Sequence, residues 1–433
     1  MPRSRVAPLL RFRPSVGLIL PFILLSSCLC AGQGRPGFKL LHSFGGSGDG
    51  DAPSSGVVFD TKGNLYGTTG AGGAYGYGTV YELSPQNDGT WTETILHSFP
   101  NPGSTQDGSE PSGGVAIDRK GNLYGTAESG GANSRGIIFE LTPGDNGWAE
   151  SILYNFCSLP GCTDGGSPGT APVLDSAGSL YGGTNSGFGQ GVVYELTPSG
   201  SGWEEDVLYT FCSQPDCTDG RFPGQVVMDR RGNIYGPTDE GGSDFGYCPL
   251  GCGVVFVLNP PNLDGGWTET VLHAFQGGTD GIGPNGITFY GGKIFGTTGL
   301  GGGSQDCTIG CGTVFAIAPG ENGGAPQEEV LYAFSNFSGG QNPGGAPVFD
   351  KAGNMYGVAG FGGAPCGCGL VWELKRVTGG WQYKILHDFT GGDGVLPLGS
   401  LTIDSNGNLY GTTNGGSTGG VVFEILNASP TAK

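Results

Sequence analysis

The chain has 433 residues and a net charge of −19, and 91 residues are glycine while only 13% are charged. An acidic surface repels nucleic acid and anionic lipid, so the charge argues against a nucleic-acid-binding protein and against direct attachment to a membrane surface. The aromatic and β-branched residues recur in short apolar runs, which fits neither a disordered tail nor an ordinary helical enzyme. The composition favours turn-rich β-structure.

Residues 1–31 have the pattern of a secretory signal. Four arginines precede an apolar run from Val16 to Leu25, which is short for a membrane span. Leu25 to Cys28 also resembles a bacterial lipobox, in which the cysteine is lipidated, whereas cleavage near Ala31 would give free secretion. We therefore expect export to the periplasm, the outer membrane or cell surface, or the medium, with membrane contact only through a lipid on Cys28.

Ten further cysteines occur as five close pairs. An even number at short spacing in an exported chain predicts local disulfides. Zinc is the alternative, but the spacings are not C-x-x-C, and an oxidising compartment disfavours free thiolates. The expected disulfides are Cys157–Cys162, Cys212–Cys217, Cys248–Cys252, Cys307–Cys311 and Cys366–Cys368.

The motif NLYGTT and its variants return seven times along the chain. A fixed period of this size predicts a solenoid, a propeller or an array. The intervals run from 54 to 61 residues. The aromatic residue of the motif is Tyr66, Tyr124, Tyr181, Tyr235, Phe295, Tyr356 and Tyr410.

Each period contains four short β-like runs in the same order. In the first repeat they are GVVFD at 56–60, NLYGTT at 64–69, GTVYEL at 78–83 and WTETILHSF at 91–99. A D-x-x-G-N turn, whose glycine supplies a positive φ, connects the first two. Solenoid repeats are usually shorter and need capping units, so four-stranded meanders with short connections favour a propeller. We predict an all-β fold, a seven-bladed β-propeller with four antiparallel strands per blade.

The seventh repeat lacks its fourth run, and a copy of that run, FKLLHSF, stands alone at 38–44. We predict that this N-terminal strand closes the ring by pairing with Val421 to Ile425, which hides an edge that could otherwise template aggregation. One propeller is then expected over 38–426, before a tail at 427–433. The expected blades are about 55–99, 113–156, 170–211, 224–275, 285–334, 345–389 and 399–426 plus 38–44.

All four histidines occupy one slot of the fourth run, where the other three repeats have tyrosine. A slot that accepts either residue, two positions before a phenylalanine, predicts packing with a polar tip rather than catalysis or metal binding. A match to G-x-S-x-G at 415–419 lacks a strand-to-helix context and a free histidine, so no catalytic residue is assigned. The histidines are His42, His97, His273 and His387.

The loops between blades carry D-G-x-x-P in six of seven copies. This pattern first of all predicts a turn. Its functional interpretation is a ring of carboxylates around the channel mouth that binds a polyhydroxyl ligand or a cation, with calcium suited to oxygen ligands. No compact D-x-D-x-D-G loop is present, and no other cofactor is expected. The aspartates are Asp49, Asp107, Asp164, Asp219, Asp280 and Asp393.

In an up-and-down blade, the loops after the second and fourth strands emerge on one face. This face would hold the cysteine pairs, the D-G-x-x-P loops and the glycine-rich loops bearing Tyr75, Tyr77 and Phe245. Binding sites are usually built from variable loops on a rigid scaffold. We expect a ligand, either a glycan or an envelope protein, to bind here; loop stabilisation without any ligand is the alternative.

The unit from Gly56 to Phe99 resembles the GloVer repeat, found in bacterial choice-of-anchor tandem-repeat proteins. The pieces GNLYGTT, GTVYEL and LHSF recur in this order between Phe38 and Leu426. The resemblance implies propeller-like repeats, but the family carries no established activity to transfer.

Three hypotheses follow for the function. The first is a monomeric, non-catalytic exported propeller that acts as a binding or interaction module at the cell surface or in the periplasm, with carbohydrate as the first ligand class to test. The second is an enzyme of lyase, lactonase or quinoprotein type that uses carboxylates at the channel mouth. The third is a structural envelope protein.

Overall fold

The computed structural model describes residues 37–103, 106–187, 190–200, 202–242, 246, 248–261, 265–320 and 324–426. The chain divides into two units, Met1–Arg35 and Pro36–Lys433, and the described residues all lie in the second. The expected signal segment, the lipidation site Cys28 and the tail at 427–433 lie outside them. Within the described ranges, no helix is long and apolar enough to span a membrane.

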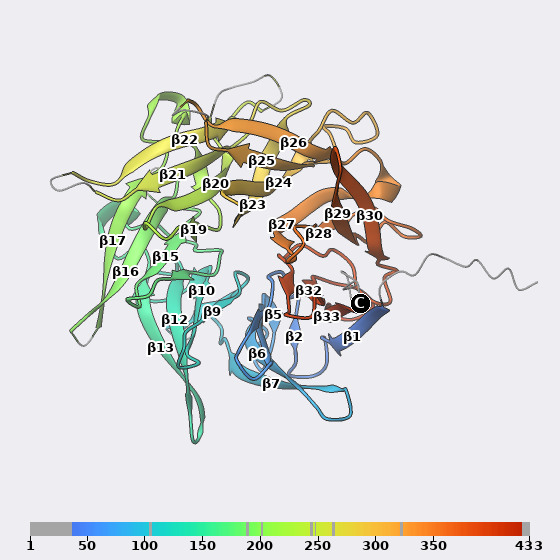
Figure 1. Ribbon diagram of the computed structural model, residues 1–433. Coiled ribbons are helices and arrows are strands. Elements are labelled where there is room, and N and C mark those ends of the chain that lie inside the picture. The colour runs from blue at the N-terminus through green and yellow to red at the C-terminus, as the bar shows by residue number, and fades with distance from the viewer. Residues whose placement is uncertain are drawn as a thin grey trace, which may run out of the picture. The chain divides into compact units, whose positions relative to one another are not determined.

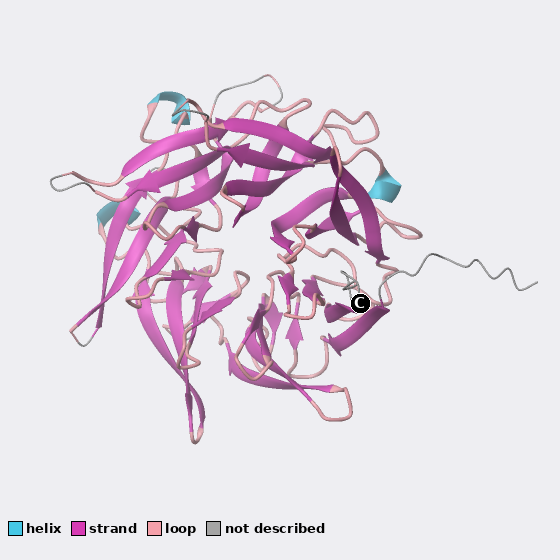
Figure 2. Cartoon of the chain, viewed as in Figure 1, coloured by secondary structure: helices cyan, strands magenta, loops and turns pink. Residues whose placement is uncertain are grey.

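Seven antiparallel sheets form a ring in the second unit, and Figure 1 shows them around a central opening. Nearly all regular structure is strand, and the helical pieces in Figure 2 are single 3₁₀ turns such as Pro160–Cys162 and Pro215–Cys217. In Figure 1, first strands such as β23 and β27 lie toward the centre, and fourth strands such as β13 and β17 lie outside. The predicted all-β, seven-bladed propeller is confirmed.

The bounds of the blade strands are as follows. Blade 1 has β3 (Val58–Phe59), β4 (Leu65–Thr69), β6 (Thr79–Pro85) and β7 (Trp91–Ser98); blade 2 has β9 (Val115–Ile117), β10 (Leu123–Ala127), β12 (Ile137–Gly144) and β13 (Gly147–Asn155); blade 3 has β14 (Val173–Leu174), β15 (Leu180–Gly183), β16 (Val192–Ser199) and β17 (Gly202–Thr210). Blade 4 has β19 (Val227–Met228), β20 (Ile234–Glu240), β21 (Val254–Asn259) and β22 (Thr268–Ala274); blade 5 has β23 (Gly281–Tyr290), β24 (Lys293–Gly301), β25 (Thr313–Ala318) and β26 (Gln327–Ala333). Blade 6 has β27 (Gln341–Phe349), β28 (Met355–Phe361), β29 (Leu370–Val377) and β30 (Gly380–Asp388); blade 7 has β31 (Thr402–Ile403), β32 (Leu409–Thr413), β33 (Val421–Leu426) and β1 (Gly37–Ser43).

The seventh blade takes its outer strand from the N-terminal side. β1 pairs antiparallel with β33, with Phe38 opposite Ile425 and His42 opposite Val422. Phe38 also packs on Phe423 and Phe389, with ring centroids 6.0 and 6.1 Å apart. β1 therefore lies where the repeat pattern predicts it, and the sheet β1-β33-β32-β31 joins the two ends of the ring.

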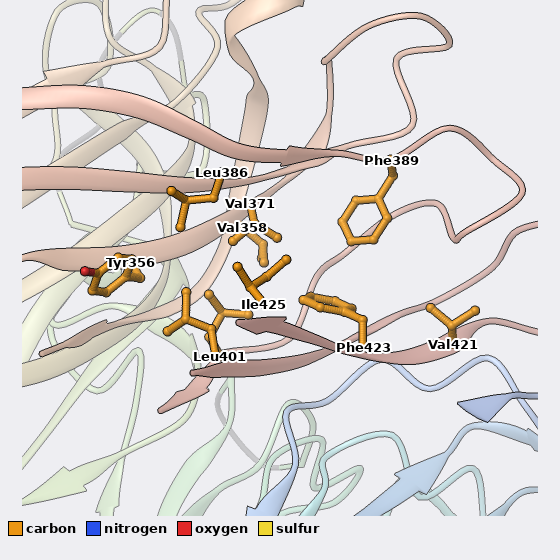
Figure 3. Close-up of a cluster of buried hydrophobic side chains, with 10 residues drawn as sticks. Tyr356, Val358, Val371, Leu386, Phe389, Leu401, Val421, Phe423 and Ile425 are labelled. Carbon is orange, nitrogen blue, oxygen red and sulfur yellow. The ribbon is translucent and has the colours of Figure 1, made fainter. Parts of the chain in front are cut away.

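The hydrophobic core lies between neighbouring blades rather than within one. Figure 3 shows Phe389 of blade 6 packed with Phe423 and Ile425 of blade 7. Each fourth strand leads to a buried phenylalanine that contacts a ring on the next blade, as Phe99 does with Phe139 at 5.3 Å. Because every blade buries two faces, no blade can hold its core without both neighbours.

Short extra strands form on the side of the inter-blade loops. β2 (Gly50–Asp51) pairs with β5 (Ala71–Gly72), and β8 (Gly108–Ser109) pairs with β11 (Ser129–Gly130). In blade 4, β18 (Arg221–Pro223) pairs with the end of β20. The runs in blades 1 and 2 consist of glycine, serine, aspartate and alanine, which have low β-propensity, so no sequence signal predicts them. Their ladder hydrogen bonds hold the D-G-x-x-P loops against the ends of the second strands.

Candidate binding site at the channel mouth

The ring encloses a central cavity of about 530 Å³, lined by residues from all seven repeats. The lining is uncharged, and it combines short hydroxyl and amide side chains with glycines and a few aliphatic residues such as Val115 and Leu398. None of the described residues that line it is acidic or basic. The polar side chains at the wall include Ser54, Ser112, Thr170, Gln225, Asn285, Asn342 and Ser400.

The residue before the proline of each inter-blade loop has the same unusual backbone conformation. Its φ lies between +52° and +62° in all seven copies, a region that residues other than glycine rarely adopt. The backbone N–H donates to a carbonyl of the preceding blade, as from Phe222 to Gln190 at 2.7 Å, and the following proline is buried. We call these seven residues the mouth ring. They are Ala52, Glu110, Ser167, Phe222, Gly283, Asn342 and Leu396.

The mouth ring presents six different side chains and one glycine, Gly283, on one repeated backbone conformation. The buried proline and the hydrogen bond hold each position, while the side chain stays accessible to solvent. Strained backbone that persists in six of the seven copies is typical of positions that a site must orient. The mouth ring is hard to find from the sequence, because its members share a backbone conformation and not a residue type. The available signal was that the residue before the loop proline differs in every repeat.

Two pockets open beside the mouth ring between blades 3 and 6. One, of about 460 Å³, is lined by Asn185, Phe222, Asp239 and Asn285. The other, of about 480 Å³, is lined by Asp239, Asn285 and Leu250 among others. Asn285 lines both pockets and the central cavity, so the three spaces are adjacent. Asp239 remains accessible to solvent, yet the protein atoms crowded around it raise the pKa of its carboxyl.

The six predicted aspartates turn away from the channel and toward the outer strands. Asp49 Oδ2 lies 3.3 Å from His42 Nε2 on β1, and Asp164 accepts from the Tyr154 hydroxyl on β13 at 2.9 Å. The other four make the same contact with the histidine or tyrosine before their loop. The carboxylates are therefore not the ring around the channel mouth that the sequence suggested, because each aspartate begins its loop beside the strand it leaves.

At five of these six blade junctions, a glutamate on the fourth strand of the following blade completes a cluster. Glu93 Oε2 lies 3.7 Å from His42 Nε2, and Glu205 Oε2 accepts from the Tyr154 hydroxyl at 3.4 Å. Burial first, and then the neighbouring Asp49, raise the pKa of Glu93 to about 8. Burial and the nearby Asp164 raise the pKa of Glu205 to about 7. We call each set of histidine or tyrosine, aspartate and glutamate a junction cluster.

The histidines pack against phenylalanines, as predicted. Each also lies beside a loop aspartate, which the sequence did not reveal. The rings of His42 and His97 meet Phe44 and Phe99 edge-to-face, with centroids 4.6 Å apart in both pairs. The polar tip of His97 lies 3.1 Å from Asp107. Burial alone would lower the pKa of His97, but Asp107 and the adjacent glutamate together raise it.

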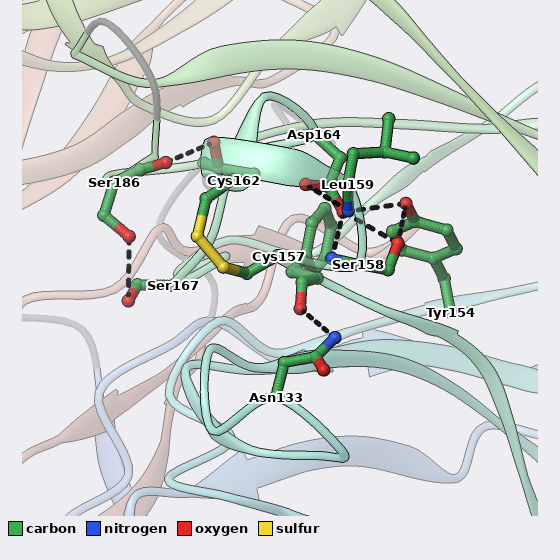
Figure 4. The surroundings of a disulfide bond; sticks show 11 residues. Asn133, Tyr154, Cys157, Ser158, Leu159, Cys162, Asp164, Ser167 and Ser186 are labelled. Carbon is green, nitrogen blue, oxygen red and sulfur yellow. Dashed lines mark hydrogen bonds between the residues drawn. A yellow bond between two sulfur atoms is a disulfide. The ribbon is translucent and has the colours of Figure 1, made fainter.

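All five predicted disulfides are present. Figure 4 shows one of them closing the loop that carries Ser158, whose backbone N–H donates to Asp164 at 2.7 Å. Loops after second and fourth strands touch one another, since the Gly242 N–H donates to the Cys217 carbonyl at 3.0 Å. Disulfides persist in oxidising compartments, so they favour an extracellular or envelope location.

Comparison with known proteins agrees with this architecture. Residues 32–187 match the model of the Gloeobacter/Verrucomicrobia repeat. Within these residues the chain carries this repeat. The resemblance drawn from the sequence is thereby confirmed, and the seven-bladed arrangement fits it. No protein with a curated description matches the chain.

Two solved structures are similar in fold to this chain. PorZ, an essential bacterial surface component of the type-IX secretion system of Porphyromonas gingivalis, is 16% identical with a TM-score of 0.55, over 90% of this chain and 49% of PorZ. A fungal alcohol oxidase of the AA5 family, in complex with copper, is 15% identical with a TM-score of 0.53, over 91% of this chain and 77% of the oxidase. This chain thus spans about half of PorZ. At such identities the similarity shows the fold alone.

The loops after the second and fourth strands lie on one face, which we call the loop face. The tips of these loops expose apolar side chains. Leu159, Leu250 and Ile309 lie inside disulfide-closed loops and are 47%, 56% and 49% exposed. Of the predicted aromatic set, Tyr75 is 63% exposed, whereas Tyr77 packs against the core between blades 1 and 2. The third member, Phe245, lies outside the described residues. Tyr75 and Tyr77 therefore do not share one exposed platform.

Proposed function

We propose that this protein is an exported, non-catalytic binding module that takes a carbohydrate at the channel mouth. The observation that carries the proposal is the mouth ring, in which one backbone position per repeat has the same positive φ and six of the seven carry side chains of different types. Phe222 offers an aromatic face, while Asp239 and Asn185 offer hydrogen-bonding groups in the same pocket. Sugars are recognised by such combinations of an apolar surface and a few convergent polar groups.

Glycan-array screening of the mature protein, followed by calorimetry on the best ligand, tests the proposal. We expect Phe222→Ala and Asp239→Asn each to weaken binding at least about tenfold, which corresponds to about 1.4 kcal/mol. Phe289→Ala is the matched control, because Phe289 is 37% exposed at a hairpin on the other side of the blade. If Phe222→Ala keeps wild-type affinity, the mouth pocket is not the sugar-binding site. Tyr75→Ala should leave the affinity unchanged, whereas a loss of affinity in this variant would place the sugar on the loop tips.

A protein partner in the cell envelope is the second candidate. The apolar tips Leu159, Leu250 and Ile309 favour it, because exposed apolar groups on rigid loops are typical of protein interfaces. Cross-linking in the native envelope, compared between wild type and a Leu159→Ser, Leu250→Ser, Ile309→Ser variant, would detect such a partner. Unchanged cross-links in that variant would exclude the tips as the interface.

An enzyme of lyase, lactonase or quinoprotein type now depends on Asp239 and Glu240, which line a mouth pocket, rather than on the six loop aspartates. No observation favours that alternative over binding, and the same holds for a purely structural envelope role. Export as a monomer, with lipidation at Cys28 or cleavage near Ala31, belongs to this proposal too. The intact mass of the mature protein distinguishes the two N-termini.

A further inference from the structure

Three of the junction clusters combine one imidazole with two carboxylates. In each of them, one potential ligand atom from each residue lies within 4.8 Å of the others. We propose that these three histidine junctions bind divalent transition-metal ions, with zinc as the best match, and that each ion links two neighbouring blades. The clusters are His42, Asp49 and Glu93; His97, Asp107 and Glu150; and His273, Asp280 and Glu328.

The spacing of the ligand atoms suits zinc. His42 Nε2 lies 3.3 Å from Asp49 Oδ2 and 3.7 Å from Glu93 Oε2. The corresponding distances from His97 Nε2 are 3.1 and 3.6 Å. Ligands at about 2.1 Å from a tetrahedral zinc ion lie about 3.4 Å from one another. An ion can therefore enter between these side chains with little rearrangement.

A further carboxylate oxygen in each of these clusters is available to a cation. The other carboxylate oxygen, Oε1, of Glu93, Glu150 and Glu328 is buried and has no hydrogen-bond partner. A buried carboxylate oxygen without a partner is costly, and a cation beside it removes that cost. Two carboxylates also balance the charge of one divalent ion.

The nitrogen ligand distinguishes these junctions from the others and selects the metal. The unpartnered oxygen recurs in Glu205 and Glu269, whose junctions have tyrosine in place of histidine. Calcium and magnesium prefer oxygen ligands alone, whereas imidazole with carboxylates suits zinc. The calcium expected from the aspartates alone is thus the weaker match. Three protein ligands leave one position of a tetrahedral ion for water.

The junction of the fourth histidine lacks the glutamate, so we expect it to bind no ion. His387 lies 3.0 Å from Asp393, but Phe38 occupies the position of the glutamate. The Phe38 ring stacks on His387 with centroids 4.0 Å apart. The predicted stoichiometry is therefore three ions per chain, fewer than the number of histidines. One of the three ions spans the junction that β1 closes, because His42 belongs to β1 and Glu93 to β7.

Titration of the chelator-treated mature protein with zinc chloride, followed by native mass spectrometry and calorimetry, tests this inference. We expect three zinc ions per chain and no comparable binding of calcium chloride. His42→Tyr, His97→Tyr and His273→Tyr should each remove one ion, whereas His387→Tyr should retain all three. Tyrosine is the substitution of choice because the chain uses it in the same slot, where it still donates to the aspartate.

Thermal unfolding gives a second measurement that does not depend on counting ions. Zinc should raise the Tm of wild type and of His387→Tyr by at least about 3 °C, because a ligand of the folded state stabilises it. The triple variant at 42, 97 and 273 should fold, by circular dichroism, but show no shift. Absence of binding to wild type, or equal binding and an equal Tm shift in the triple variant, overturns the proposal.

Discussion

At the scale of single residues, the glycine of NLYGTT explains why the motif recurs. A Cβ at this glycine would collide with the aromatic ring of the third strand, as at Gly67 against Tyr81 and at Gly125 against Phe139. The repeat therefore couples a glycine on one strand to a large ring on the next. The aromatic ring therefore occupies the space that a side chain at the glycine would need.

This coupling predicts a large loss of stability for Gly125→Ala. The methyl group has no room beside the buried Phe139, so we expect a loss of about 2–3 kcal/mol in the free energy of unfolding, as for other overpacked cores. Gly202→Ala is the control, since nothing lies within 4 Å of a Cβ built there. Urea denaturation measures both, and equal stabilities would contradict the steric argument.

The tyrosine junctions predict a pH dependence. Glu205 has its pKa raised to about 7 in the folded protein, against 4.5 as its ordinary value. The folded state holds this proton up to about pH 7 while the unfolded chain loses it near its ordinary pKa. The contribution of Glu205 to stability therefore falls as pH rises between these values and is constant above them.

Glu205→Gln should cancel that fall. We expect the variant to equal wild type near pH 4.5 and to exceed it by about 1 kcal/mol at pH 8, after the 1.4 kcal/mol per pKa unit is reduced for solvent screening. Glu204→Gln, on the same strand with an exposed side chain, should show no such trend. Denaturation series at several pH values check the sign, which the opposite slope would refute.

At the scale of elements, β1 decides whether the ring closes. Its removal would expose the edge of β33 and take Phe38 off Phe423 and Phe389. We expect deletion of 38–44 to lower the Tm by more than about 10 °C or to cause aggregation through the open edge. Trimming 427–433 serves as the control and should leave the Tm nearly unchanged. Similar Tm values for the two truncations would mean that β1 does not hold the ring together.

At the scale of the whole molecule, the disulfides order the loops but do not hold the blades of the ring together. Each disulfide joins cysteines two to five residues apart, so none connects two blades. Cross-links that close such short loops restrict the unfolded chain little. We expect reduction to keep the β-sheet circular dichroism spectrum while the loop tips become sensitive to proteolysis. Collapse of the spectrum on reduction would show that the loops hold the ring.

The sequence by itself determined the architecture, because seven copies of four runs and one misplaced strand allow a single closed arrangement. It also determined the disulfides, since ten cysteines in five close pairs leave few alternatives. Only the tertiary structure decided the direction of the aspartates, which turn toward His42, Tyr154 and their equivalents instead of the channel. It likewise revealed the mouth ring and the junction clusters. Both depend on contacts between residues of different blades. The repeat pattern along the chain does not show which side chains of two neighbouring blades meet.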